Sequence, residues 1–357
     1  MADRYIFPYL SSSKLFSKYD FFKKFTEDVT VINKTEQIFV KEETSLSKIS
    51  SQVSASVVNV LSIQQVSNKK MATIEPINGT GIIVTSDGLI MTYVSAIIPE
   101  FSEYKVLTSD GNYYDAQLLG TDTFSNLAFL KINASNLPVM PVGNSDDSKP
   151  GEKIIIIGNN MGYYANRYAS GLLSNFNPVF NLSGKAISFS DKLEGVFQAD
   201  VPFMKDYIGG PVIDYTGQVI GIVGSIEKNG NVEYFQIPSN KMKEVIERAI
   251  SKDFTSNPSL GAYYLPLTKS QALINQLKTD RGALVYSSSG QQGLAVIAGS
   301  PAQKSGLMIN DIIKSINGRE IDLKNSLPDI LYQYKKGDEV ELTIVRNQQE
   351  IKIKVNL

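Results

Sequence analysis

The feature that most constrains the fold is a long succession of short apolar segments separated by tight turns, between residues 45 and 251. The segments are rich in β-branched and aromatic residues, which favour strands. They lie at 57–63, 81–84, 89–93, 104–108, 114–119, 127–132, 153–158, 196–199, 219–223 and 234–237. Asp-Gly, Thr-Gly and Asn-Gly pairs between them are typical of turns that join antiparallel neighbours. Many short strands at this spacing predict a mainly β protein, built as a sandwich or as barrels.

The rest of the chain divides around this region. Residues 1–44 carry eight aromatic side chains between Tyr5 and Phe25, and they are interpreted either as an ordered tail or as an oligomerisation arm. The strand-rich region, 45–250, closes with apolar residues at helical spacing from about residue 239. A polar stretch ending in proline, 251–258, predicts a linker, and a second domain follows at 259–357.

Composition excludes several classes of function. The net charge of the 357 residues is −1, so no basic excess indicates nucleic-acid binding. No apolar run approaches the roughly 18 to 20 residues that a membrane span needs. The chain has no cysteine and no histidine, which removes thiol chemistry, the usual general base and the commonest metal ligand. We therefore expect no metal site and no cofactor.

The stretch 198–212, QADVPFMKDYIGGPV, resembles the nucleophile loop of chymotrypsin-like serine proteases of the HtrA type. Further landmarks of that family follow in its order: NGTGIIVTSDGLIMT, SNLAFLKI, VGNSDDSKPGEKIIIIGN, YASGLLS, TGQVIGIV and FQIPSNKMKEVIERAI. The resemblance implies a protease-type domain of two six-stranded β-barrels, with the ancestral active site between them.

Carried over position by position, the resemblance implies a degenerate catalytic triad. Ile208 stands where the family has its nucleophilic serine, Ser95 where it has histidine and Asn126 where it has aspartate. Asp206 replaces the glycine whose backbone N–H helps to form the oxyanion hole, and its carboxylate would oppose a developing negative charge. From these positions we expect a pseudoprotease that is not an enzyme.

A replacement for the triad stays open at this point. Serine paired with lysine is a known variant, and Ser95, Lys205 and Asp206 fall near the ancestral site by this alignment. A lysine has to lose several pKa units through burial before it can act as a base near neutral pH.

Residues 259–357 resemble a PDZ domain of the HtrA kind, through SLGAYYLPLT, GSPAQKSGL and NDIIKSING. The resemblance makes Leu260, Gly261 and Ala262 the loop whose N–H groups bind the C-terminal carboxylate of a peptide. The peptide would then add as a strand beside Ala262 and Tyr263.

A helix expected at 325–335 places Leu327, Ile330 and Leu331 at helical spacing. They either line the pocket for the last side chain of the peptide or belong to the core, and the second interpretation is expected for at least one of them.

The predicted function is binding of peptides or proteins with apolar C-termini by a regulatory scaffold. The alternatives are an active HtrA-type serine endopeptidase of protein quality control and a purely structural oligomer. The resemblance also implies a homotrimer, alone or mixed with an active paralogue. It further implies an extracytoplasmic location, the periplasm or surface of a bacterium. The abrupt start in aromatic and basic residues is also what would follow a membrane anchor upstream of residue 1.

Overall fold

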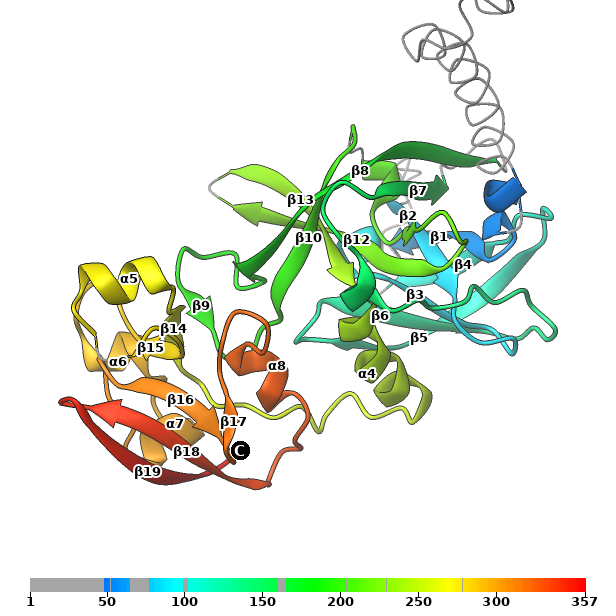
Figure 1. The fold of residues 1–357 in the computed structure, drawn as a ribbon. Coiled ribbons are helices and arrows are strands. Elements are labelled where there is room, and N and C mark those ends of the chain that lie inside the picture. Colours follow the sequence, from blue (N-terminus) through cyan, green and yellow to red (C-terminus); the bar gives the residue numbers. More distant parts are fainter. Residues whose placement is uncertain are drawn as a thin grey trace, which may run out of the picture. The chain divides into compact units, whose positions relative to one another are not determined.

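The computed structural model describes residues 48–51, 53–64, 77–98, 102–159, 165–202, 205–228, 230–277 and 279–357. The chain divides into two units, Met1–Gln52 and Val53–Leu357. The second unit contains two closed six-stranded barrels and a C-terminal sheet, which confirms the predicted mainly β architecture (Figure 1). The proposed oligomerisation segment, residues 5–25, lies outside the described residues. Among the described residues, no helix has the length and apolarity needed to cross a bilayer.

The first barrel has the strand order β1-β2-β3-β6-β5-β4, and neighbouring strands run antiparallel. Its strands are β1 (Val57–Gln64), β2 (Ile77–Ile83), β3 (Leu89–Tyr93), β4 (Ser102–Leu107), β5 (Tyr113–Asp122) and β6 (Leu127–Ile132). The 3-10 turn η2 (Val94–Ala96) follows β3. All six strands coincide with predicted segments.

The second barrel has the order β10-β13-β12-β11-β7-β8. Its strands are β7 (Lys153–Asn159), β8 (Asn166–Asn181), β10 (Glu194–Asp200), β11 (Pro211–Ile213), β12 (Val219–Lys228) and β13 (Asn231–Pro238). Two 3-10 turns, η3 (Ser145–Asp147) and η4 (Lys205–Tyr207), lie before β7 and before β11. Helix α4 (Ser239–Ile250) ends this part of the chain.

A run of four isoleucines in β7 explains how the barrels meet. Ile154 and Ile156 belong to the core of the second barrel. Ile155 and Ile157 point to the other face of the strand, yet they are also fully buried. β7 packs against β1 and β2 of the first barrel. An unbroken apolar strand is therefore needed here, because both of its faces are covered.

The C-terminal sheet has the order β19-β18-β16-β15-β14-β9, and β17 pairs with β16. Its elements are β14 (Tyr263–Pro266), α5 (Lys269–Ile274), β15 (Ala283–Val285), α6 (Gln292–Ala295), α7 (Pro301–Lys304), β16 (Ile312–Ile316), β17 (Arg319–Glu320), α8 (Leu327–Leu331), β18 (Glu339–Arg346) and β19 (Gln349–Asn356). The edge strand β9 (Ser188–Phe189) comes from the segment between β8 and β10 of the second barrel. Two closing strands predicted from the sequence at 340–346 and 350–355 are present as β18 and β19. The helix expected at 325–335 is wrong in length, since α8 has five residues.

Candidate functional site

The loop around Ile208 packs tightly between the barrels. The Ile208 side chain is 5% exposed, and the Ile208 carbonyl accepts from the Thr80 N–H at 3.1 Å. A Cβ atom on Gly209 would lie 2.1 Å from the Thr80 oxygen, and one on Gly210 would lie 2.0 Å from the Ile157 oxygen. Only glycine permits such approaches, and Gly209 also has φ +81°. The two glycines that define the loop in the sequence therefore have a packing reason to be there.

The residues predicted at the other two catalytic positions gather near the end of β3. The Val94 N–H donates to the Asn126 carbonyl at 2.9 Å, which fixes the turn before β6 next to η2. Asn126 adopts φ +59° and donates from its amide nitrogen to the Tyr93 hydroxyl at 3.3 Å. Ser95, which is exposed on η2, lies 2.9 Å from Ser225 between the two hydroxyl oxygens. The structure thus brings residues 95 and 126 to the same end of the first barrel.

Burial controls the ionisation of the groups around Asn126. It raises the pKa of Tyr93 to about 12, so this hydroxyl stays neutral. The Lys192 ammonium donates to the Asn126 side-chain oxygen at 3.1 Å and to the Thr123 carbonyl at 2.5 Å. Burial lowers the pKa of Lys192, against the opposing charge of Asp122. Asn126 is therefore held by partners on both ends of its amide.

The Asp206 side chain, at the oxyanion-hole position, is paired with a charged residue. It forms an ion pair with Arg167 at 2.8 Å, and the Asp206 carbonyl accepts from the Thr80 hydroxyl at 2.6 Å. The Ile208 N–H, one of the two donors expected for such a hole, donates instead to the Lys205 carbonyl at 3.1 Å. The Ile208 N–H is therefore already bonded to the backbone of the turn that η4 forms.

The predicted carboxylate loop of the C-terminal domain has its N–H groups directed at side-chain oxygens. The N–H groups of Leu260 and Gly261 donate to one carboxylate oxygen of Asp191, at 3.0 and 3.1 Å. The Ala262 N–H donates to the Ser190 hydroxyl at 3.0 Å. Gly261 adopts φ +77°, the conformation that lets neighbouring N–H groups converge. The loop has the geometry of a carboxylate site, and a carboxylate is in it.

Tyr263 lies on β14 opposite Phe189 of β9, with the two ring centroids 4.8 Å apart. Leu327, Ile330 and Leu331 on α8 are at most 3% exposed and belong to the core of the domain. All three are therefore core residues in this structure.

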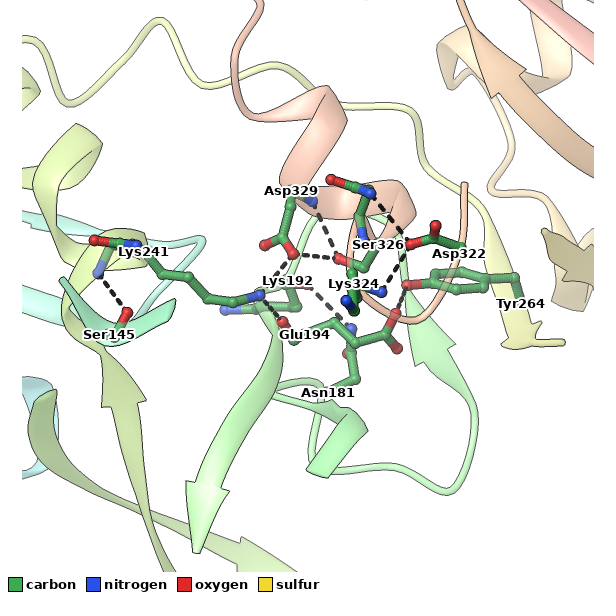
Figure 2. Close-up of polar contacts among 12 residues, drawn as sticks. Ser145, Asn181, Lys192, Glu194, Lys241, Tyr264, Asp322, Lys324, Ser326 and Asp329 are labelled. Atoms are coloured by element: carbon green, nitrogen blue, oxygen red, sulfur yellow. Dashed lines mark hydrogen bonds and ion pairs between the residues drawn. The ribbon is translucent and has the colours of Figure 1, made fainter. Parts of the chain in front are cut away.

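A buried acid joins the second barrel to the C-terminal sheet. Glu194, on β10, is 1% exposed and accepts from the Ser188 hydroxyl at 2.5 Å and the Tyr264 hydroxyl at 2.6 Å. Burial raises its pKa to about 7, more than these two bonds lower it. Figure 2 shows Lys241 of α4 reaching this cluster, where it pairs with Asp329 of α8 at 2.6 Å and donates to the Glu194 carbonyl.

Sequence patterns missed Ser190, Asp191 and Glu194. Asp191 looks like an ordinary turn residue, and its partners lie about 70 positions further along the chain. A weak signal was present in Glu194, since an acid between apolar residues at the start of a strand is uncommon.

Comparison with known proteins agrees with this fold. Residues 79–222 match the trypsin-like peptidase domain, and residues 267–357 match the PDZ domain. A probable periplasmic serine endoprotease of the DegP-like type from Chlamydia muridarum is 31% identical over 287 residues, which is 79% of this chain and 54% of the relative. The serine protease Do-like HtrA of Bacillus subtilis is 31% identical over 288 residues, 78% of this chain and 61% of the relative. The chain thus spans little more than half the length of these curated relatives.

Among solved structures, the HtrA-type protease AlgW with a tripeptide has a TM-score of 0.67 at 23% identity. The match covers 87% of this chain and 95% of that one, which shows that the fold is shared.

These findings correct the expectation that the chain is not an enzyme. That expectation rested on a few positions placed by motif, whereas relatives named as serine proteases are similar over more than three quarters of the chain. The chain thus has a trypsin-like peptidase domain followed by a PDZ domain, and over most of its length it is similar to serine proteases of the HtrA and DegP-like types.

Proposed function

We propose that the chain acts on polypeptides in extracytoplasmic protein quality control and captures free C-termini ending in an apolar residue. The observation that carries this proposal is the loop at residues 260–262, where two N–H groups converge on one carboxylate oxygen. Relatives named as periplasmic endoproteases support the location. A bacterial host is part of the same proposal.

The chemistry of the loop favours a terminal carboxylate over other peptide groups. A charged acceptor bound by backbone N–H groups contributes about 1.5–3 kcal/mol for each bond, more than a neutral carbonyl does. Strand addition beside Tyr263 would supply main-chain hydrogen bonds that do not depend on the peptide sequence. The domain would thus select chain ends and tolerate many sequences.

A titration with short fluorescent peptides tests this function. Peptides that end in an apolar residue with a free carboxylate should bind, and amidation of that terminus should weaken binding by about tenfold or more, because the charged acceptor is gone. Equal affinity for the free and the amidated peptide would show that Leu260 to Ala262 do not bind a carboxylate.

The second candidate function is serine endopeptidase activity, and the curated relatives favour it. We propose that Ser95, Asn126 and Ile208 occupy the family's catalytic positions. Two observations support this assignment: residues 94 and 126 are hydrogen-bonded to each other, and the loop of residue 208 packs near the end of β3. An isoleucine has no atom that can attack a carbonyl, and the chain has no histidine. Hydrolysis would therefore use other groups, and the hydroxyl pair Ser95–Ser225 lies beside these positions.

Digestion of unfolded casein tests the second candidate. Turnover by the purified chain, free of contaminating protease, supports it, and no turnover contradicts it. The variant that combines Ser95→His, Asn126→Asp, Asp206→Gly and Ile208→Ser should cleave casein at least about 10³-fold faster than the parent, since triad members act as a unit. The single changes Asn126→Asp, Asp206→Gly and Ile208→Ser should each stay close to the parent rate. A single change that matched the combined variant would show that the positions are wrongly assigned.

A further inference from the structure

The peptide groove of the PDZ domain is filled by the chain itself. Asp191 gives one carboxylate oxygen to the Leu260 and Gly261 N–H groups, at 3.0 and 3.1 Å, and its other oxygen accepts from the Ser259 hydroxyl. The Ala262 N–H donates to the Ser190 hydroxyl at 3.0 Å. Every backbone N–H of the predicted carboxylate loop therefore has a partner from residues 190–191.

The segment before Asp191 makes the strand contacts of a bound peptide. Ser188 and Phe189 pair antiparallel with Tyr264 and Tyr263 of β14, so the segment runs toward the carboxylate loop as a peptide C-terminus would. The Ser190 N–H donates to the Ala262 carbonyl at 3.0 Å, in continuation of this ladder. The strand pairing of residues 188–190, the direction in which they run and the Asp191 carboxylate all match what the C-terminus of a bound peptide would supply.

Contacts on both sides hold this segment in place. Glu194 accepts from the Tyr264 hydroxyl on β14 at 2.6 Å (Figure 2). It also accepts from the Ser188 hydroxyl on β9 at 2.5 Å, and so bridges the two strands. At the other end the Leu193 N–H donates to the Phe124 carbonyl of the first barrel at 3.0 Å. Since the segment is tethered to the domain, its effective concentration at the groove is high.

We propose that residues 188–191 are an internal ligand of the PDZ domain, with the Asp191 side chain in place of a terminal carboxylate, and that a C-terminal peptide binds by displacing them. This inference rests on the proposed capture of C-termini. The groove is then closed in most molecules, and the apparent affinity for peptides is reduced by the fraction that is open.

Substitution of Asp191 in the full chain tests the inference. Asp191→Ala should bind a fluorescent peptide with a free apolar C-terminus at least about tenfold more tightly than the parent, because the internal carboxylate no longer competes. Asp146→Ala, which changes an exposed acid on η3, should bind like the parent. The amidated peptide should gain nothing from either change. Circular dichroism melting of each variant checks that it is folded.

The outcomes separate the inference from the function on which it rests. Equal binding by the parent and Asp191→Ala, with the free carboxylate still required, overturns the internal ligand and leaves C-terminal capture standing. No carboxylate-dependent binding by either protein overturns both.

A reversible lock gives a second test that does not depend on deleting Asp191. Phe189 and Tyr263 lie directly opposite each other on β9 and β14, and the chain has no cysteine of its own. The double variant Phe189→Cys, Tyr263→Cys should bind no peptide when oxidised and should recover binding on reduction, whereas each single variant should ignore the redox state. Equal binding by the oxidised and reduced double variant would overturn the proposal.

Discussion

At the scale of single residues, Glu194 is a carboxyl group held in an environment very different from water. Its carboxyl is buried between the Ser188 and Tyr264 hydroxyls, and burial raises its pKa to about 7 from the ordinary 4.5. The Tyr264 hydroxyl stays neutral and donates, because burial also raises its pKa. Glu194 therefore takes up a proton on folding over the window between these two pKa values.

This uptake predicts how stability depends on pH. Between pH 4.5 and 7 the folded state binds more protons than the unfolded state, so the free energy of unfolding should fall as pH rises. A shift of this size corresponds to a loss on the order of 3 kcal/mol across the window. Glu194→Gln should remove that component, because a glutamine does not titrate. Urea unfolding at a series of pH values measures it.

The matched control for this prediction is Glu247→Gln, at an exposed position on α4. It should keep the pH dependence of the parent. If Glu194→Gln kept the same dependence as well, another group would be responsible for it.

At the scale of elements, the barrel strands with a regular pattern of apolar residues were predicted, whereas two irregular barrel strands, β8 and β11, were not. β8 has sixteen residues, nearly all of them exposed or half-buried, and its apolar residues do not alternate. β11 has three residues and is fully buried, too short for any period to appear. Both are strands because their neighbours in the barrel supply the hydrogen bonds, which is a tertiary effect.

Helix α8 shows why a helical pattern can overestimate length. Leu327, Ile330 and Leu331 have the expected spacing, and Ser326 caps the helix by accepting from the Asp329 N–H. Past residue 331 the carbonyls of Tyr332 and Tyr334 accept from the Arg248 guanidinium, at 2.6 and 3.1 Å. The Lys336 N–H, which would bond to the Tyr332 carbonyl in a longer helix, donates to the Ser256 carbonyl. Arg248 lies more than 80 residues away along the chain from the carbonyls that it bonds.

At the scale of the whole molecule, the first barrel, α4, the linker and the PDZ domain are joined by polar and aromatic contacts. The Phe124 and Tyr332 rings stack with centroids 4.1 Å apart, and the buried Asp122 carboxylate accepts from the Asn257 amide and the Tyr332 hydroxyl. The Arg248 guanidinium lies 4.4 Å from the Tyr332 ring centroid. The predicted linker at 251–258 therefore takes part in packing within this unit.

Assembly is the prediction that belongs to this scale. Eight aromatic side chains between residues 5 and 25 would expose a large apolar surface on a monomer, so we expect the full chain to form a trimer through this segment. Light scattering on the full chain should give three times the mass of one chain, and on the chain starting at residue 45 the mass of one. A single chain's mass in both cases would contradict the prediction.

The sequence by itself determined the strand-rich region, most strands of the barrels, the PDZ signature and the absence of histidine and cysteine. These are properties of local pattern and composition, which a short window of residues contains. Only the tertiary structure decided that Asp191 enters the carboxylate loop, that Glu194 is buried and that the Ile208 N–H is already bonded. Each of these depends on contacts between segments that folding brings together, and no local pattern records which distant group will fill a site.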